Sequence, residues 1–324
     1  MKRMTIAVAA LAGLGLCAGC EQDFYAKQII VHNTDSGKLA LDLTGPAEQL
    51  IKQKRIDLNP RLTMADGTEI DVWVIKAKAD PPAPPRATAL LLHGLTASKA
   101  KYLRAGERLA KMGYDVVLPD LRAHGHSGGD YVTFGAKEKA DVKQVIDALV
   151  GGGTVHRDVY VFGETLGAAT AIQYATIDTR CKGIVAVDPY RDAASQGRRL
   201  LVLLAPAMSN RDFDKCLARA GEIADFDPNQ ASSEIAAASV TCPLLIVYGL
   251  LSVPAEDCKA IYDAAKGPKK LQPIAPLPGP EQLGFLADYQ GWVADKVHKM
   301  ATSGVLDESP KPAPAPATAP AGGT

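Results

Sequence analysis

The sequence predicts an α/β protein with a mostly parallel sheet that helices cover on both faces. Short apolar runs alternate with helical patterns from about residue 87 to residue 300. The run 87–93 is almost continuously apolar, which is typical of a strand buried on both faces. Glycine clusters such as Gly151-Gly152-Gly153 end helical patterns. These observations together favour a doubly covered sheet.

The elements follow in chain order. A hairpin is expected over 56–77, around the turn Ala65-Asp66-Gly67, and a proline-rich connector follows at 81–85. The expected strands are 87–93, 116–119, 159–162, 183–187, 244–248 and 271–274. The expected helices are 102–112, 138–150, 166–177 and 283 to about 300. The stretch 189–240 is an insertion with helical patterns at 198–204 and 212–224.

We divide the chain into four parts. Residues 1–19 are a signal peptide, 20–54 a tether and helical lead-in, 55–304 the α/β domain with its insertion, and 305–324 a disordered tail rich in Pro and Ala. The 36 basic and 36 acidic residues balance, so no net field would recruit nucleic acid. We expect no cofactor.

The first residues indicate export. Lys2 and Arg3 precede an apolar stretch, 5–16, that is too short to span a bilayer comfortably. The sequence Leu-Cys-Ala-Gly-Cys at 16–20 resembles the lipobox of bacterial lipoproteins, although Cys17 stands where an aliphatic residue is usual. This resemblance implies a lipid anchor on Cys20, with the bilayer as partner. Glu21 in place of an aspartate favours the outer membrane. The alternative is an ordinary signal peptide cut at residues 18–19.

Export would place four further cysteines in an oxidising compartment. Cys181 and Cys242 each precede a predicted buried strand, so a bridge between them is sterically plausible if those strands are neighbours. Cys216 would then pair with Cys258. Four free buried thiols are the alternative. No Cys-x-x-Cys or Cys/His cluster predicts a metal site.

A series of motifs resembles the α/β-hydrolase superfamily over roughly residues 55–300, in particular its bacterial serine-hydrolase and S33-peptidase-like branch. The motifs are Leu-Leu-His-Gly at 91–94, Asp-Leu-Arg-Ala-His-Gly-His-Ser-Gly at 120–128, Gly-Glu-Thr-Leu-Gly at 163–167, Val-Asp-Pro at 187–189 and Cys-Pro-Leu-Leu-Ile-Val-Tyr-Gly at 242–249. The resemblance implies a hydrolase fold in which the insertion 189–240 forms a cap.

The nucleophile turn departs from this family's pattern. The family has Gly-x-Ser-x-Gly between a strand and a helix, and here Gly163 and Gly167 flank Thr165. Thr165 has a hydroxyl, but its extra methyl crowds a strained position. Two interpretations stay open: Thr165 acts as the nucleophile, or the turn is structural only. The resemblance places an oxyanion hole at the backbone amides of Leu95 and Leu166.

The acid and the base of the family are also missing. Where the family has an aspartate before Val-Pro, this chain reads Gly-Leu-Leu-Ser-Val-Pro at 249–254. Asp188 is the candidate for a relocated acid. Pro280 stands where the family has its histidine. His126 could be a relocated base, and His298 lies too far along the last helix.

These losses predict a lipid-anchored envelope protein that has the hydrolase fold, is inactive or impaired, and binds a small ligand or an envelope partner. The alternative is an active hydrolase of esters or peptides that uses Thr165. A third possibility is an envelope spacer.

Overall fold

The computed structural model describes residues 18–30, 45–202, 204–249, 253–274 and 288–303. Within these ranges no helix combines the length and apolar character needed to cross a membrane. The expected signal peptide (apart from residues 18 and 19), the loop that contains Pro280 and the tail from 305 on lie outside them.

Eight strands form one sheet in the order β1-β2-β4-β3-β5-β6-β7-β8. They are β1 (Arg61–Thr63), β2 (Glu69–Ile75), β3 (Thr88–Leu92), β4 (Asp115–Pro119), β5 (Val159–Glu164), β6 (Cys181–Val187), β7 (Leu244–Tyr248) and β8 (Lys269–Pro273). β1 pairs antiparallel with β2, and β2 with β4, whereas β4 to β8 are parallel. The mostly parallel sheet is therefore as predicted.

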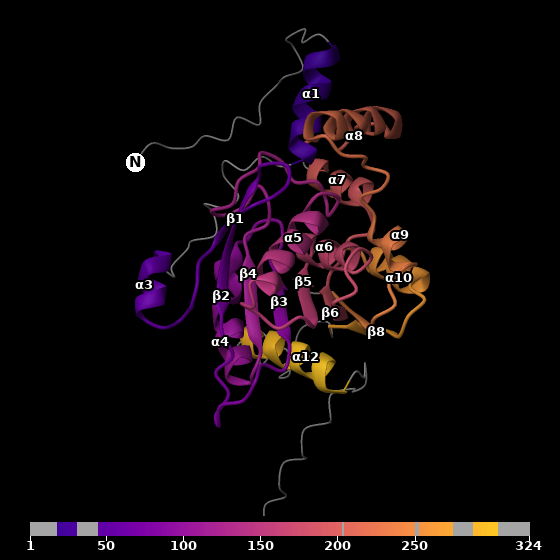
Figure 1. Ribbon diagram of the computed structural model, residues 1–324. Helices are drawn as coiled ribbons and strands as arrows, with labels where there is room; N and C mark the ends of the chain where they lie inside the picture. Colours follow the sequence, from indigo (N-terminus) through magenta and orange to yellow (C-terminus); the bar gives the residue numbers. More distant parts are fainter. Residues whose placement is uncertain (1–17, 31–44, 203, 250–252, 275–287, 304–324) are drawn as a thin grey trace, which may run out of the picture.

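Helices cover both faces of the sheet (Figure 1). The helices are α1 (Ala18–Ile29), α3 (Ala47–Lys52), the 3-10 helix η1 (Lys99–Tyr102), α4 (Leu103–Lys111), α5 (Glu138–Gly151), α6 (Leu166–Tyr174), α7 (Ala193–Leu201), α8 (Asn210–Ala224), α9 (Ser233–Ala237), α10 (Ala255–Ala264) and α12 (Tyr289–Ser303). α4 and α12 pack on one face, and α5, α6 and α10 belong to the other.

Strand β3 shows how the sequence produces two cores. Leu90 and Leu92 join the cluster beneath α5 and α6, and Ala89 and Leu91 join the cluster beneath α4 and α12. Successive strand residues point to opposite faces, so a strand between two helical layers is apolar at nearly every position. The continuous apolar run at 87–93 is therefore explained.

The insertion between β6 and β7 carries α7, α8 and α9. α1 packs on α7 and α8, so the start of the expected tether is bound to the cap (Figure 1). Asp23 pairs with Arg219 of α8 at 2.6 Å, and Gln22 donates a hydrogen bond to the Lys215 carbonyl. α7 begins five residues before the predicted start because Asp192 caps it, with its side chain accepting from the Ser195 amide.

The cysteines are free thiols in the structure. The Sγ atoms of Cys181 and Cys242 lie 3.8 Å apart across the start of the neighbouring strands β6 and β7, as the sequence suggested, but no bond joins them. The expected Cys216–Cys258 bond is likewise not formed. Both cysteines are buried: Cys216 lines a pocket beside α1, and Cys258 donates to the Pro189 carbonyl.

Candidate active site

The turn between β5 and α6 holds Thr165 in an unusual backbone conformation. Its φ is +46° and its ψ is −103°, outside the regions that a β-branched residue normally adopts. Two backbone hydrogen bonds fix it: the Thr165 amide donates to the Val187 carbonyl at 2.9 Å, and the Ala169 amide donates to the Thr165 carbonyl at 2.9 Å. Such strain costs about 1–3 kcal/mol and persists only where its surroundings impose it.

The two flanking glycines make the tight turn possible. A Cβ atom on Gly163 would collide with the Gly167 carbonyl, and one on Gly167 would collide with the Leu92 carbonyl. Because these obstacles are backbone atoms, no side-chain movement could relieve them. The glycine requirement inferred from the sequence pattern is therefore explained by packing of strand against helix.

The Thr165 side chain lies beside the loop that follows β3. A Cβ atom on Gly94 would stand 2.7 Å from Thr165 Oγ1. The expected oxyanion donors, the amides of Leu95 and Leu166, belong to this loop and to the first residue of α6. Among the described residues, neither amide donates a hydrogen bond to the protein. The hydroxyl and both donors are thus on adjoining segments at the carboxyl edge of the sheet.

Asp188 lies on the next strand. Glu164 pairs with Val187 in the β5–β6 register, so Thr165 and Asp188 follow paired residues. Asp188 is fully buried, has a φ of +44°, and its Oδ1 accepts a hydrogen bond from the Gly249 amide at 2.8 Å. The carboxylate is therefore engaged with the loop after β7. Its place at a strand end suits an acid, and one of its oxygens is engaged by the Gly249 amide.

Comparisons with known proteins agree with this geometry. Residues 83–221 match the family model described as serine aminopeptidase, S33. The Pyrococcus furiosus esterase Pf2001 superposes with a TM-score of 0.57 over 77% of this chain and 95% of that one, at 22% sequence identity. An acetyl xylan esterase from Paenibacillus sp. R4 superposes with a TM-score of 0.52 over 76% of this chain and 92% of that one, at 16% identity.

This chain has the α/β-hydrolase fold, and less than half of its length matches the serine aminopeptidase family model. A further relative, the uncharacterized protein YqkD of Bacillus subtilis, is 35% identical over 89 residues, which is 27% of this chain and 29% of that protein. The chain thus matches less than a third of that relative's length. The family match at 83–221 includes the Thr165 turn and ends before 249–254 and Pro280, where the resemblance led us to expect an acid and a base.

An α/β-hydrolase needs an imidazole beside its nucleophile, and none of the five described histidines hydrogen-bonds to Thr165. His93 is fully buried, its Nδ1 contacts the Gly94 carbonyl, and its Nε2 accepts from the Leu121 amide. Burial, together with His124, lowers the pKa of His93 to about 3, so this ring stays neutral. His93 connects the loop after β3 with the loop that begins at Asp120, at the edge of the sheet.

The ring nitrogens of three other histidines contact groups other than Thr165. The two ring nitrogens of His124 contact the carbonyls of Arg122 and Leu95. His156 Nδ1 accepts from the Asp158 amide, and His298 Nδ1 lies 2.9 Å from the hydroxyl of Tyr114. His298 is only partly exposed, not a free surface residue, and His32 lies outside the described residues.

His126 was the candidate for a relocated base. Its side chain is 67% exposed, and Nδ1 faces Asp120 Oδ2 at 3.8 Å. The contact with Asp120 raises the pKa of His126, while Asp120, buried beside Lys99, has a pKa well below its usual range. Lys99 also pairs with Asp71 at 2.7 Å. These charges stabilise the loop at 120–128, and the structure does not join His126 to Thr165.

The sequence interpretation missed a polar cluster on Glu164. Its buried carboxylate accepts hydrogen bonds from Lys101 Nζ at 2.6 and 2.7 Å, from the Tyr102 hydroxyl at 2.6 Å and from the Tyr289 hydroxyl at 2.8 Å. Burial and the neighbouring carboxylate raise the pKa of Tyr102 and of Tyr289, which keeps both phenols protonated as donors. The cluster ties the residue before Thr165 to η1 and α12.

The one sequence signal for this cluster is Glu164, an acid at the variable position directly before Thr165 in the turn. The partners of Glu164 are distant in sequence, so no local pattern predicts them. Among the residues with described positions, no group of three His, Cys, Asp or Glu side chains is arranged to hold a metal ion.

Proposed function

We propose that the chain is a lipid-anchored α/β-hydrolase-like protein of the cell envelope that binds a small ligand without serine-hydrolase turnover. One observation carries the proposal: no described imidazole reaches the Thr165 hydroxyl. The six histidines of the sequence are His32, His93, His124, His126, His156 and His298, and the segment where the family has its base contains Pro280 instead.

Proton transfer explains why this matters. A hydroxyl attacks a carbonyl carbon only if a neighbouring base accepts its proton as the new bond forms. Thr165 also brings a methyl group into a strained turn that serine would occupy more easily. Among the described residues, no imidazole serves this hydroxyl as a base, and its methyl group adds crowding to the turn.

The part of the site that depends on backbone atoms is retained. The Leu95 and Leu166 amides make no hydrogen bonds within the described protein, and the second stands at the start of α6, where the helix dipole favours negative charge. A carbonyl or carboxylate oxygen would satisfy both donors. This chemistry supports ligand binding over the alternative of a pure spacer.

An active hydrolase is the second candidate. Thr165 keeps the backbone conformation of a nucleophile turn, its hydroxyl lies beside the oxyanion loop, and Asp188 stands on the adjoining strand. The esterases to which this fold is similar make carboxylic esters the first substrates to test.

One experiment separates the two candidates. The purified mature chain is assayed with p-nitrophenyl esters and with a fluorophosphonate probe, alongside Thr165→Ala and a variant that combines Thr165→Ser, Pro280→His and Ser252→Asp. We expect no turnover and no labelling in the wild type, and esterase activity only in the combined variant. Wild-type turnover that Thr165→Ala abolishes would instead establish the active enzyme.

A further inference from the structure

An exposed apolar segment lies in the cap, directly after α7. The sequence from 200 to 208 reads Leu-Leu-Val-Leu-Leu-Ala-Pro-Ala-Met without a polar residue. Val202 is 55% exposed and Leu204 is 49% exposed, and Pro206 and Ala207 are exposed as well. We call Val202 together with 204–208 the apolar loop. Water-soluble surfaces rarely expose several neighbouring apolar residues in this way, so the loop calls for a partner.

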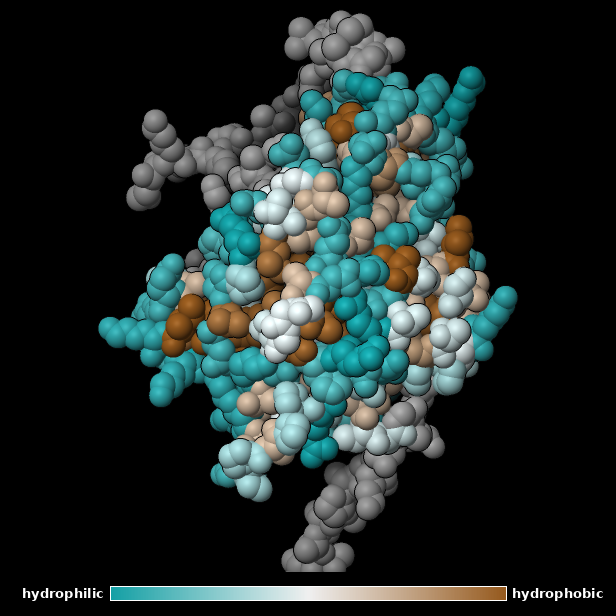
Figure 2. All heavy atoms as spheres, in the orientation of Figure 1, coloured by the Kyte–Doolittle hydropathy of each residue, from teal (hydrophilic) through white to brown (hydrophobic). Residues whose placement is uncertain are grey.

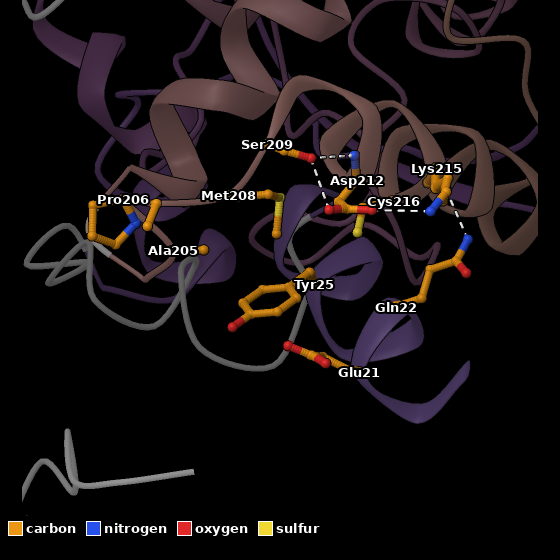
Figure 3. Close-up of a pocket in the computed structure, with 11 residues that line it drawn as sticks. Glu21, Gln22, Tyr25, Ala205, Pro206, Met208, Ser209, Asp212, Lys215 and Cys216 are labelled. Carbon is orange, nitrogen blue, oxygen red and sulfur yellow. Dashed lines mark hydrogen bonds and ion pairs between the residues drawn. The ribbon is translucent and has the colours of Figure 1, made fainter. Parts of the chain in front are cut away.

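The apolar loop faces helix α1 across a pocket of about 580 Å³. Glu21, Gln22 and Tyr25 line it from α1, residues 205–208 line it from the loop, and Ser209 and α8 contribute a third side. Figure 3 shows the Met208 side chain extending toward the ring of Tyr25 on α1. The first turns of α1 and the loop therefore form one continuous surface.

Helix α1 is fixed in this position. The ion pair between Asp23 and Arg219 and the hydrogen bond from Gln22 to the Lys215 carbonyl attach it to α8. Phe24 of α1 is itself 48% exposed. Figure 1 shows α1, α7 and α8 together at one end of the molecule, and Figure 2 shows apolar side chains among polar ones at this end. The expected lipidation site, Cys20, directly precedes Glu21, which lines the pocket.

We propose that the apolar loop and Phe24 form a membrane-docking surface that enters the interfacial region of the bilayer. The inference rests on the lipid anchor of the proposed function, because the anchor at Cys20 would hold this end of the cap at the membrane. An apolar segment that reaches the boundary between head groups and acyl chains adds to the affinity that a lipid anchor provides. Docking in this way turns the cap toward the bilayer.

The test removes the anchor and measures the surface alone. The mature chain from residue 20, carrying Cys20→Ser, is mixed with vesicles of phosphatidylethanolamine and phosphatidylglycerol, and bound protein is measured by cosedimentation. We expect partitioning into vesicles, reduced about tenfold or more by Val202→Asp combined with Leu204→Asp. Both side chains are exposed, so the double variant should fold normally, which its circular dichroism and thermal midpoint verify.

Ile235→Asp is the matched control. Ile235 is 64% exposed, but it lies on α9, which packs against α6 and α10. This variant should bind vesicles like the parent. The inference is overturned if the parent does not bind vesicles or if all three proteins bind equally. It is also overturned if the parent is a dimer in gel filtration and the double variant is a monomer, because a second copy of the chain would then cover the apolar loop. Lipid labelling of Cys20 is measured separately, so loss of the anchor and loss of docking are distinguishable.

Discussion

At the scale of single residues, a serine hydrolase needs both a strained turn that presents its hydroxyl and a base that accepts the hydroxyl proton. These two requirements depend on different residues of this chain. The conformation of Thr165 depends on backbone packing, which Gly163 and Gly167 permit and which the Val187 carbonyl reinforces. Reactivity depends instead on a neighbouring base. A chain can therefore keep the turn while losing the chemistry, because a backbone hydrogen bond does not depend on which hydroxyl the turn presents.

The close approach of Gly94 to Thr165 gives a residue-scale prediction. Gly94→Ala places a methyl group 2.7 Å from Thr165 Oγ1, and such overpacking should lower the free energy of unfolding by about 1–3 kcal/mol. In a Thr165→Ala background the clashing oxygen is gone, so the same substitution should cost well under about 1 kcal/mol. Urea unfolding of the four proteins measures the coupling.

Gly151→Ala is the control for this double-mutant cycle of Gly94→Ala and Thr165→Ala. No atom lies within 4 Å of a Cβ placed on Gly151, at the end of α5. It should leave stability unchanged or slightly raised. Equal costs of Gly94→Ala in both backgrounds would show that the hydroxyl is not where we describe it.

At the scale of elements, parallel pairing of β6 with β7 decides which cysteines meet. Ile184 pairs with Leu244, so Cys181 and Cys242 both stand at the amino-terminal end of this strand pair. Strand neighbours fix the distance, and 3.8 Å between the sulfur atoms is close enough for a small movement to join them. The hydrogen bond with Cys242 and burial raise the pKa of Cys181, which disfavours its thiolate.

We therefore predict that oxidised glutathione converts Cys181 and Cys242 to a disulfide. Two thiols are oxidised, and one glutathione disulfide is reduced to two glutathione thiols. The bond should raise the free energy of unfolding by about 2–4 kcal/mol, because it closes a long loop. Intact mass should fall by two hydrogen atoms, and peptide mapping should find the cross-link.

Cys258→Ser should behave like the parent in this experiment, whereas Cys181→Ser should not form the bond. If all four thiols still react with maleimide after oxidation and unfolding, the two strand ends are held too rigidly to close.

At the scale of the whole molecule, the anchor candidate and the cap lie at one end, and α12 covers a face of the sheet away from them (Figure 1). The anchor itself has a whole-molecule prediction. In a bacterial host, Cys20→Ser should move the protein from the membrane fraction to the soluble fraction and remove labelling by a palmitate analogue. Both changes follow from the loss of the acyl chains.

Cys17→Ser is the matched variant, since Cys17 belongs to the same motif but would be removed with the signal peptide. It should remain labelled and membrane-bound. A wild type that is secreted without label would support the alternative cut at residues 18–19.

Sequence periodicity predicted the strands well, because a strand buried on both faces has few polar positions. The positions 87–93 and 244–248 illustrate this, and the observed strands at those places agree closely. Helix limits were predicted less well where a side chain sets them, as Asp192 does for α7. The short helices α3 and α9 carry too few turns for a reliable apolar pattern.

The sequence alone determined the fold class, which the structure confirms, and it predicted the loss of the usual acid and base, since both inferences depend on residue identity along single segments. Only the tertiary structure brought the partners of Glu164, which lie up to 125 positions from it, into one cluster and packed α1 on the cap. Such contacts depend on chain segments that meet through folding, and neither local periodicity nor a short motif records which distant side chain will face another.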